Sequence, residues 1–143
     1  MSELDVLGPL AILVADDQPG IRRLLQEVFA EAGNTVWLAA GGEQAIELVR
    51  NHELDVALID VKMPGMCGLD ALAEIQRIAP RLPVIMMTAY GDNDVIDSAG
   101  QRGARSTIAK PFDIDEVKRE VLRVVAEARL PLAAEGKAPY GGE

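Results

Sequence analysis

Residues 56–65 read Val-Ala-Leu-Ile-Asp-Val-Lys-Met-Pro-Gly, and the other predicted elements are interpreted by their relation to this segment. Four consecutive apolar residues predict a strand that is buried on both faces, as in a parallel sheet. Asp60 follows the apolar run directly, so we expect its side chain at the carboxyl edge of that sheet. Because ligands bind at this edge in open α/β sheets, Asp60 is the candidate reacting group.

Four further short apolar runs predict strands, at residues 10–15, 35–40, 83–87 and 106–109. Apolar residues at helical spacing follow each of the five runs, so helices alternate with the strands. This alternation predicts an α/β fold, a parallel sheet covered by helices on both faces. The strand at 35–40 is short and less apolar than the others, so we expect it near an edge of the sheet.

Two of the predicted helices carry further signals. The helix over 92–103 has a thin apolar face, and Gly100 and Gly103 would each cost about 1 kcal/mol relative to alanine in a helix interior. We therefore expect it to be the most mobile helix. The last helix opens at Asp113, with a capping box completed by Glu116.

Polar residues follow four of the five predicted strands and should meet at one edge of the sheet. They are Asp16 and Asp17, Asp60, Thr88, and Lys110. Two carboxylates about 4 Å apart repel by ~4 kcal/mol at an effective dielectric near 20, so one lysine cannot offset three acids. A divalent cation can, and oxygen ligands suit Mg²⁺.

A hard cation beside a lysine and a hydroxyl group predicts phosphoryl transfer. Asp60 is the expected nucleophile, which would form an aspartyl phosphate. Lys110 would pair with the phosphoryl group, and Thr88 would donate a hydrogen bond to it once it is attached.

At these residues the chain resembles the receiver domains of two-component response regulators. The resemblance covers residues 10–128 and is carried by Asp16-Asp17, Asp60 with Met63-Pro64-Gly65, Thr88-Ala89 and Lys110-Pro111. It implies a flavodoxin-like, doubly wound (βα)5 fold with strand order 2-1-3-4-5 and a cis bond between Lys110 and Pro111. It also implies that a sensor histidine kinase is the phosphoryl donor. Mg²⁺ would be held by Asp17, Asp60 and the backbone carbonyl of Lys62, with Asp16 acting through water.

Further segments are similar to single-domain members of this family that pass phosphoryl groups along a relay, which makes a downstream histidine phosphotransferase an expected partner. These segments are residues 16–18, 20–22, 24–25, 27–29, 87–91 and 109–116. Three residues depart from that pattern, namely Pro19, Cys67 and Thr107. Most receivers carry an aromatic residue in place of Thr107, so we expect a weak conformational response to phosphorylation and a monomer.

Two predictions concern surfaces near Asp60. Gln18, Ile21 and Leu24 follow the first pair of acids and are expected to dock the donor protein, although helical spacing alone leaves Ile21 and Leu24 open as core residues. Lys62 and Tyr90 are bulky enough to crowd the water that would hydrolyse an aspartyl phosphate. We therefore expect slow autodephosphorylation.

Composition limits the other function classes. The 143 residues predict one domain at 10–129, a lead-in at 1–9 and a flexible tail at 130–143. A net charge of −9 disfavours nucleic acid and anionic membranes as partners of this domain. A single cysteine, the lack of an apolar run of ~20 residues and the lack of a signal pattern predict a cytoplasmic protein.

Alternative functions are distinguished by single positions. A general phosphatase with an aspartyl intermediate would carry a second acid two residues after its nucleophile, where Lys62 stands, so we expect no turnover enzyme. A flavin or nucleotide module would carry a phosphate-binding loop where Asp16-Asp17 stands. The alternative that this chain is the receiver part of a longer DNA-binding transcriptional regulator is compatible with the sequence. His52 is interpreted as a plain surface residue and Cys67 as an inert thiol.

Overall fold

The chain forms one five-stranded parallel sheet in a computed structural model that describes residues 7–89 and 91–130. The strand order β2-β1-β3-β4-β5 confirms the predicted topology and places β2 at an edge, as expected. The strands are β1 Ala11–Ala15, β2 Thr35–Ala39, β3 Val56–Asp60, β4 Val84–Ala89 and β5 Ser106–Lys110. Strand β1 pairs with both β2 and β3, so the order of strands reverses between β1 and β3, at the ends of which the acids lie.

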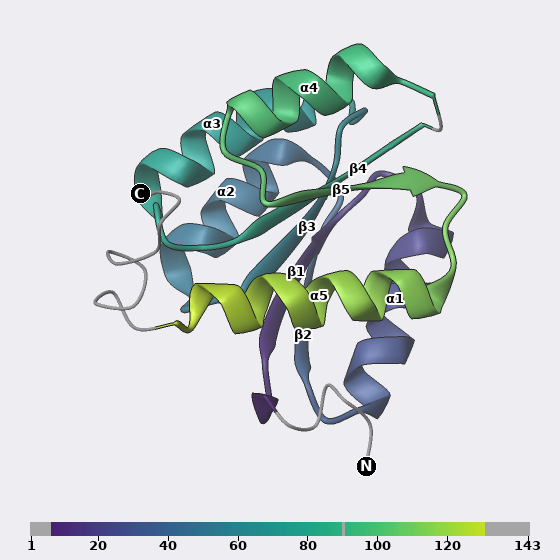
Figure 1. The fold of residues 1–143 in the computed structure, drawn as a ribbon, viewed down its shortest axis with the longest axis vertical. Helices are drawn as coiled ribbons and strands as arrows, with labels where there is room; N and C mark the ends of the chain where they lie inside the picture. Colours follow the sequence, from purple (N-terminus) through teal and green to yellow (C-terminus); the bar gives the residue numbers. More distant parts are fainter. Residues whose placement is uncertain (1–6, 90, 131–143) are drawn as a thin grey trace.

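Five helices cover the two faces of the sheet (Figure 1). They are α1 Pro19–Glu31, α2 Gly42–Asn51, α3 Gly68–Ile78, α4 Asn93–Gln101 and α5 Ile114–Ala128. Helices α1 and α5 lie on one face, and α2, α3 and α4 lie on the other. Strand β3 is therefore enclosed on both sides, and all five of its residues are buried, which explains its unalternating apolar run.

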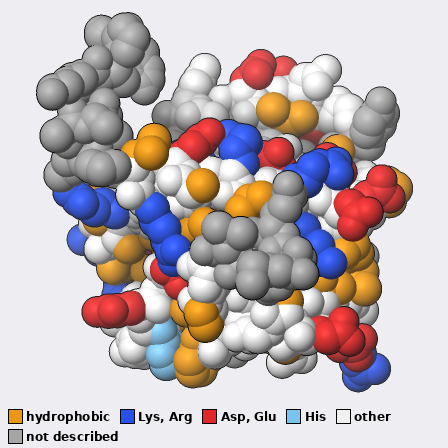
Figure 2. Space-filling model, turned by 60° about the horizontal axis from the view of Figure 1, so that its bottom comes forward, with side chains coloured by type: hydrophobic (Ala, Val, Ile, Leu, Met, Phe, Trp, Pro, Cys, Tyr) orange, Lys and Arg blue, Asp and Glu red, His pale blue; other side chains and the backbone are white. Residues whose placement is uncertain are grey.

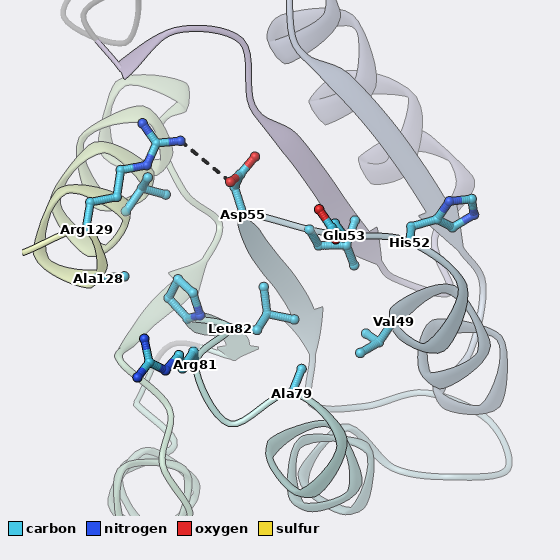
Figure 3. A pocket seen from close by; sticks show the side chains of 12 residues that line it. Val49, His52, Glu53, Asp55, Ala79, Arg81, Leu82, Ala128 and Arg129 are labelled. Atoms are coloured by element: carbon cyan, nitrogen blue, oxygen red, sulfur yellow. Dashed lines mark ion pairs between the residues drawn. The ribbon is translucent and has the colours of Figure 1, made fainter. Parts of the chain in front are cut away.

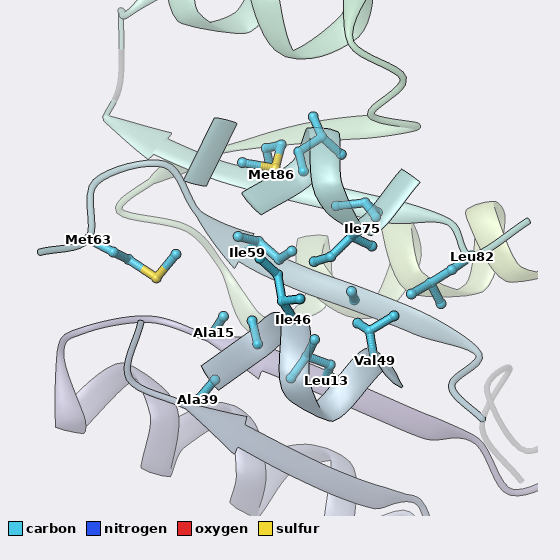
Figure 4. Close-up of a cluster of buried hydrophobic side chains, with 14 of the residues drawn as sticks. Leu13, Ala15, Ala39, Ile46, Val49, Ile59, Met63, Ile75, Leu82 and Met86 are labelled. Carbon is cyan, nitrogen blue, oxygen red and sulfur yellow. The ribbon is translucent and has the colours of Figure 1, made fainter. Parts of the chain in front are cut away.

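The core is divided by the sheet into two clusters because successive strand residues point to opposite faces. In β1, Leu13 and Ala15 pack toward α2 and α3, whereas Ile12 and Val14 pack toward α1 and α5. Figure 4 shows the first of these clusters, whose labelled side chains are all aliphatic or methionine. This packing holds the strands in register and so fixes the positions of the residues at their carboxyl ends.

Two local predictions are wrong. Asp113 is the N-cap residue of α5 but its side chain makes no capping hydrogen bond, so the predicted capping box is not formed. Gly103 lies beyond the end of α4 and has a φ of 103°, a conformation that suits the turn leaving the helix, so only Gly100 weakens the helix interior. The thin apolar face is confirmed, since Ala99 is the buried residue of α4. The mobility of α4 stays a prediction.

Several other expectations have definite outcomes at this level. The bond between Lys110 and Pro111 is cis, as the resemblance implied. Among the described residues, no helix is long and apolar enough to cross a membrane. Tyr90, the predicted tail from residue 131 onward and most of the predicted lead-in lie outside the described residues.

Candidate functional site

Three carboxylates meet at the carboxyl edge of the sheet. Asp16 and Asp17 follow β1, and Asp60 is the last residue of the neighbouring strand β3. One carboxylate oxygen from each lies within 4.8 Å of the others. Asp16 and Asp60 are buried, whereas Asp17 is exposed. The sequence thus correctly predicted that these three acids lie together.

Asp16 is fixed from three directions. Its Oδ1 accepts a hydrogen bond from the Gln18 backbone N–H at 2.9 Å, and its Oδ2 accepts one from Lys110 Nζ at 2.6 Å. Its backbone carbonyl accepts a hydrogen bond from Arg22 Nη1 at 2.6 Å. The sequence does not predict this role of Arg22, because nothing in the local pattern separates it from Arg23, the other arginine of α1.

Lys110 reaches both buried acids. Its Nζ lies 3.5 Å from Asp60 Oδ1 and 3.4 Å from Gln18 Oε1, in addition to its shorter contact with Asp16. One ammonium group is therefore shared between two carboxylates, and Asp17 adds a third negative charge within the cluster. The cluster carries more negative charge than Lys110 neutralises.

The pKa of the Asp60 carboxyl group is raised from 3.8 to about 6 in the fold. Burial is the largest cause of this shift, and the negative charge of Asp16 is the second. The ammonium of Lys110 opposes both effects. A divalent cation would stabilise the charged form of Asp60 and reverse this shift.

Thr88 contributes a hydroxyl group that is available to bind a ligand. The residue is buried, and within the described part of the chain its Oγ1 finds no hydrogen-bond partner. A buried polar group without a partner costs about 1–3 kcal/mol. Met87, the residue before Thr88, pairs with Asp60 in the sheet, so the hydroxyl lies one residue beyond Asp60 on the adjacent strand. A ligand oxygen above Asp60 would satisfy it.

An open cavity of about 590 Å³ lies over these groups, and its lining includes the residues predicted to dock a partner protein. It is lined by Asp17, Gln18, Ile21, Leu24, Asp60, Lys62, Thr88, Ala89, Lys110, Pro111 and Phe112. Leu24 is 39% exposed at the cavity. Ile21 is partly buried, and it both lines the cavity and packs against the core cluster beneath α1. Lys62 is exposed at its rim.

Other residues singled out from the sequence lie elsewhere. Thr107 is partly buried on β5, where it pairs with Met86, and does not line the cavity. Cys67 is partly buried at the start of α3. The ring of His52 stacks on Trp37 with 3.8 Å between ring centroids, at the far end of α2 from the acids.

A second cavity, of about 580 Å³, lies at the opposite edge of the sheet (Figure 3). Its lining includes residues that precede β3 and β4, such as Asp55 and Leu82, and the end of α5. Arg129 Nη2 and Asp55 Oδ1 lie 3.5 Å apart across it. The acidic cluster and Thr88 contribute nothing to this cavity, so the chemistry belongs to the first one.

The sequence matches the response regulator receiver domain family over residues 12–122. The chain belongs to this family. This receiver is 46% identical over 110 residues to sporulation initiation phosphotransferase F of Bacillus subtilis (strain 168). The alignment covers 77% of this chain and 89% of the relative. It is 42% identical over 115 residues to the DNA-binding transcriptional regulator NtrC of Escherichia coli (strain K12), which covers 80% of this chain. That alignment covers 24% of NtrC, so the receiver spans about a quarter of this relative.

A solved structure shares the fold of this receiver. It is that of the response regulator protein TrrA from Thermotoga maritima in complex with Mg(2+)-BeF. The TM-score is 0.73 at 33% sequence identity, and the match covers 80% of this chain and 98% of that chain. The architecture derived above is therefore that of a receiver domain.

Proposed function

We propose that this receiver accepts a phosphoryl group on Asp60 from the phosphohistidine of a sensor histidine kinase, in a reaction that requires Mg²⁺. The observation that carries the proposal is the meeting of Asp16, Asp17 and Asp60 beside Lys110 and the buried Thr88 hydroxyl. The acids supply ligands and a nucleophile, while the lysine and the hydroxyl group are donors for phosphoryl oxygens.

The residues fit a magnesium ion. Asp17, Asp60 and the backbone carbonyl of Lys62 would hold it, with Asp16 acting through water, because Mg²⁺ prefers oxygen ligands and keeps several waters. The geometry supports this, since three carboxylates meet beside the single ammonium group of Lys110. When bound, Mg²⁺ neutralises the acids and draws negative charge from the phosphoryl oxygens.

The chemical step proposed for Asp60 is an in-line displacement. One Asp60 carboxylate oxygen forms a bond to phosphorus as the phosphorus–nitrogen bond of the donor breaks. The electron pair of the broken bond stays on the donor imidazole, which carries a proton on its other ring nitrogen and leaves neutral. Lys110 shifts from Asp16 toward the phosphoryl oxygens, and Thr88 donates its hydrogen bond to one of them.

We further propose that the donor protein docks on the surface formed by Gln18, Ile21 and Leu24. These residues line the cavity above Asp60, and Leu24 exposes apolar area there. Exposed apolar area beside a reactive group favours a protein partner. We place the protein in the cytoplasm as a monomer that passes its phosphoryl group to a histidine phosphotransferase. The identity with the Bacillus phosphotransferase over most of both chains supports this relay role.

Slow loss of the phosphoryl group is part of the proposal. Lys62 is exposed and lines the cavity two residues after Asp60. This position supports a role in which its side chain restricts the approach of water to an aspartyl phosphate. A shielded aspartyl phosphate suits a protein that holds a phosphoryl group between two partners rather than one that turns over substrate. The variant Lys62→Ala should therefore lose its phosphate several times faster than Lys62→Arg.

The second candidate is the receiver part of a longer DNA-binding regulator, which the 42% identity with NtrC favours. Figure 2 shows basic and acidic side chains intermixed on one face outside the grey atoms, and the net charge of the chain is −9. We propose no nucleic-acid contact by this domain itself. Transfer from phosphorylated protein to a histidine phosphotransferase supports the relay role, whereas a phosphorylation-dependent dimer supports the regulator.

The test of the main proposal is labelling with a small-molecule phosphodonor, followed by intact mass. Wild-type protein with Mg²⁺ should gain one phosphate, and chelation should abolish the gain until Mg²⁺ is restored. Asp60→Asn should remain unlabelled, whereas Asp115→Asn, an exposed acid in the first turn of α5, should label like the wild type. Undiminished labelling of Asp60→Asn, or labelling in excess chelator, would show the assignment to be wrong.

A further inference from the structure

Gly68 lies against the backbone of Asp60 more closely than any other residue type would allow. A Cβ atom at this position would lie 2.1 Å from the carbonyl oxygen of Asp60. It would also lie 2.8 Å from Cα of Val61 and 2.9 Å from the carbonyl carbon of Asp60. All three atoms belong to the backbone, so no side-chain rotation relieves the contact. Residue 68 can carry a side chain only if the end of β3 and the start of α3 move apart.

The neighbouring contacts decide what would move. The Gly68 N–H donates to the carbonyl of Val61 at 2.7 Å and so closes the loop of residues 61–67. Helix α3 begins at Gly68 and is anchored by the buried side chains of Ala71, Leu72 and Ile75. Because α3 and β3 are both held by core contacts, an added methyl group would shift the start of α3 against the end of β3 and distort the loop that joins them.

The same loop is also confined on its other side. A Cβ at Gly42, the first residue of α2, would meet Cγ of Met66 at 3.1 Å and the carbonyl oxygen of Met66 at 3.2 Å. The loop therefore runs between the first residues of α2 and α3 with little free space. A displacement at Asp60 and Val61 reaches Lys62, whose backbone carbonyl is one of the proposed metal ligands.

We infer that Gly68 is a positioning residue, which sets where the Asp60 carboxylate and the Lys62 carbonyl lie. This inference rests on the proposed function, in which the Asp60 carboxylate and the Lys62 carbonyl are ligands of Mg²⁺. Gly68 is not among the residues proposed to hold the metal or the phosphoryl group. It acts through the backbone of Asp60 and through the hydrogen bond to Val61.

The test compares Gly68→Ala with Gly100→Ala in the full chain. Gly100 is a glycine of α4 whose Cβ would meet nothing within 4 Å, so it receives the same substitution without the contact. We expect Gly68→Ala to bind Mg²⁺ at least tenfold more weakly in calorimetry, and to label at least tenfold more slowly at saturating Mg²⁺. In the metal-free protein it should shift the amide resonances of Asp60 and Val61. Gly100→Ala should match the wild type in all three measurements.

A role in folding alone gives a different result. A Gly68→Ala protein that melts at a lower temperature, yet binds Mg²⁺ and labels like the wild type, overturns the inference. If wild-type protein fails to bind Mg²⁺, or Asp60→Asn still labels, the proposed function itself fails, so the two failures are distinguishable.

Wild-type protein gives a second measurement in case Gly68→Ala does not fold. If the closed loop and the metal site support each other, Mg²⁺ must slow exchange of the Gly68 amide hydrogen, because coupling between two sites is reciprocal. We expect at least threefold slowing at Gly68 and none at His52, whose N–H donates to Leu48 at the far end of α2. Unchanged exchange at Gly68 overturns the inference.

Discussion

Lys110 Nζ lies 2.6 Å from Oδ2 of Asp16, a carboxylate that is completely buried. The pair joins the end of β5 to the end of β1, with β3 and β4 between them in the sheet. Lys110 therefore passes over Asp60 to reach its shortest contact. In the unphosphorylated protein, Lys110 compensates the charge of Asp16. Its ammonium group also lies beside Asp60, the residue that would receive the phosphoryl group.

The first prediction is that Lys110→Met destabilises the metal-free protein by about 2–4 kcal/mol, because it leaves buried carboxylates without a counter-charge. Urea unfolding with and without Mg²⁺ measures the effect, and the ion should restore part of the loss. Lys118→Met on α5 is the control and should change the free energy of unfolding by less than about 0.5 kcal/mol. Equal effects of the two substitutions would contradict this account of the pair.

The second prediction concerns pH and follows from the pKa of Asp60, which is raised from 3.8 to about 6 in the fold. Between these values the folded protein binds more protons than the unfolded chain, so stability falls as pH rises through this window and stays reduced above it. A shift of about two units corresponds to roughly 3 kcal/mol, and access of water from the open cavity lowers this to about 1–2 kcal/mol. Asp60→Asn should thus stabilise the metal-free protein by that amount at pH 8.

The same shift has a consequence for labelling. Without its proton Asp60 is a nucleophile, so labelling by a small phosphodonor at low Mg²⁺ should fall as pH drops below about 6. Higher Mg²⁺ should move this midpoint to lower pH, since the ion favours the carboxylate. Denaturant unfolding of Asp60→Asn and of the wild type at pH 4 and pH 8 checks the predicted stabilisation. If the difference in unfolding free energy between the two proteins does not grow with pH, the fold does not disfavour the charged form of Asp60.

The third prediction separates docking from chemistry by means of two exposed leucines. Leu24 is 39% exposed at the cavity, and Leu130 is 53% exposed after the end of α5. Leu24→Ala should slow phosphotransfer from a histidine kinase that phosphorylates the wild type by about tenfold, since an apolar anchor at an interface contributes more than 1 kcal/mol. Leu130→Ala should not slow it. Both variants should label normally with a small phosphodonor.

Stability provides the control for these two variants and for Ile21→Ala. Exposed substitutions change the free energy of unfolding by less than about 0.5 kcal/mol, and we expect this for both leucines. Ile21 is partly buried and packs against the core, so its truncation should cost somewhat more. If Leu24→Ala slows labelling by the small donor as much as transfer from the kinase, the residue belongs to the chemistry and not to a docking surface.

Much of the site was predictable because parallel strands bring their carboxyl ends together. Asp16 and Asp60 directly follow apolar runs, and Thr88 and Lys110 lie at the ends of two more strands. The apolar pattern locates each strand, and the topology then places the four residues at one edge without any knowledge of contacts. Predictions of this kind depend on where a strand ends, which the sequence marks well.

The contacts themselves were not predictable. Whether Lys110 approaches Asp16 or Asp60 more closely depends on the twist between β1 and β5, which no local pattern encodes. The exposure of Leu24 depends on how far α1 extends past the sheet, and helical spacing is the same for both outcomes. Gly68 looks like any loop glycine until the fold brings it against Asp60, because the contact joins two backbones and leaves no apolar signal.

The last prediction starts from the pairing of Thr107 with Met86 and of Ala109 with Thr88. Residues two apart on a strand share a face, so Thr107 lies diagonally across from the Thr88 hydroxyl. The resemblance to receivers implies an aromatic residue at this position, which would move inward when that hydroxyl bonds the phosphoryl group. A threonine displaces far less apolar area than an aromatic ring, so Thr107 gives the two states nearly equal interaction energies.

Because the Thr107 side chain is small, we expect the conformational response to phosphorylation to be confined to the region around Thr88 and helix α4. We expect beryllofluoride with Mg²⁺ to shift amide resonances near Thr88 and in α4, with small shifts in α5 and no dimer. Thr107→Tyr should extend the shifts into α5 by restoring a side chain that can fill or vacate the space beside Met86. NMR titration of both proteins, with sedimentation to detect a dimer, provides the measurement. A tight, phosphorylation-induced dimer of the wild type through α4, β5 and α5 would contradict this reasoning, because it requires a large rearrangement of the surface that Thr107 cannot drive.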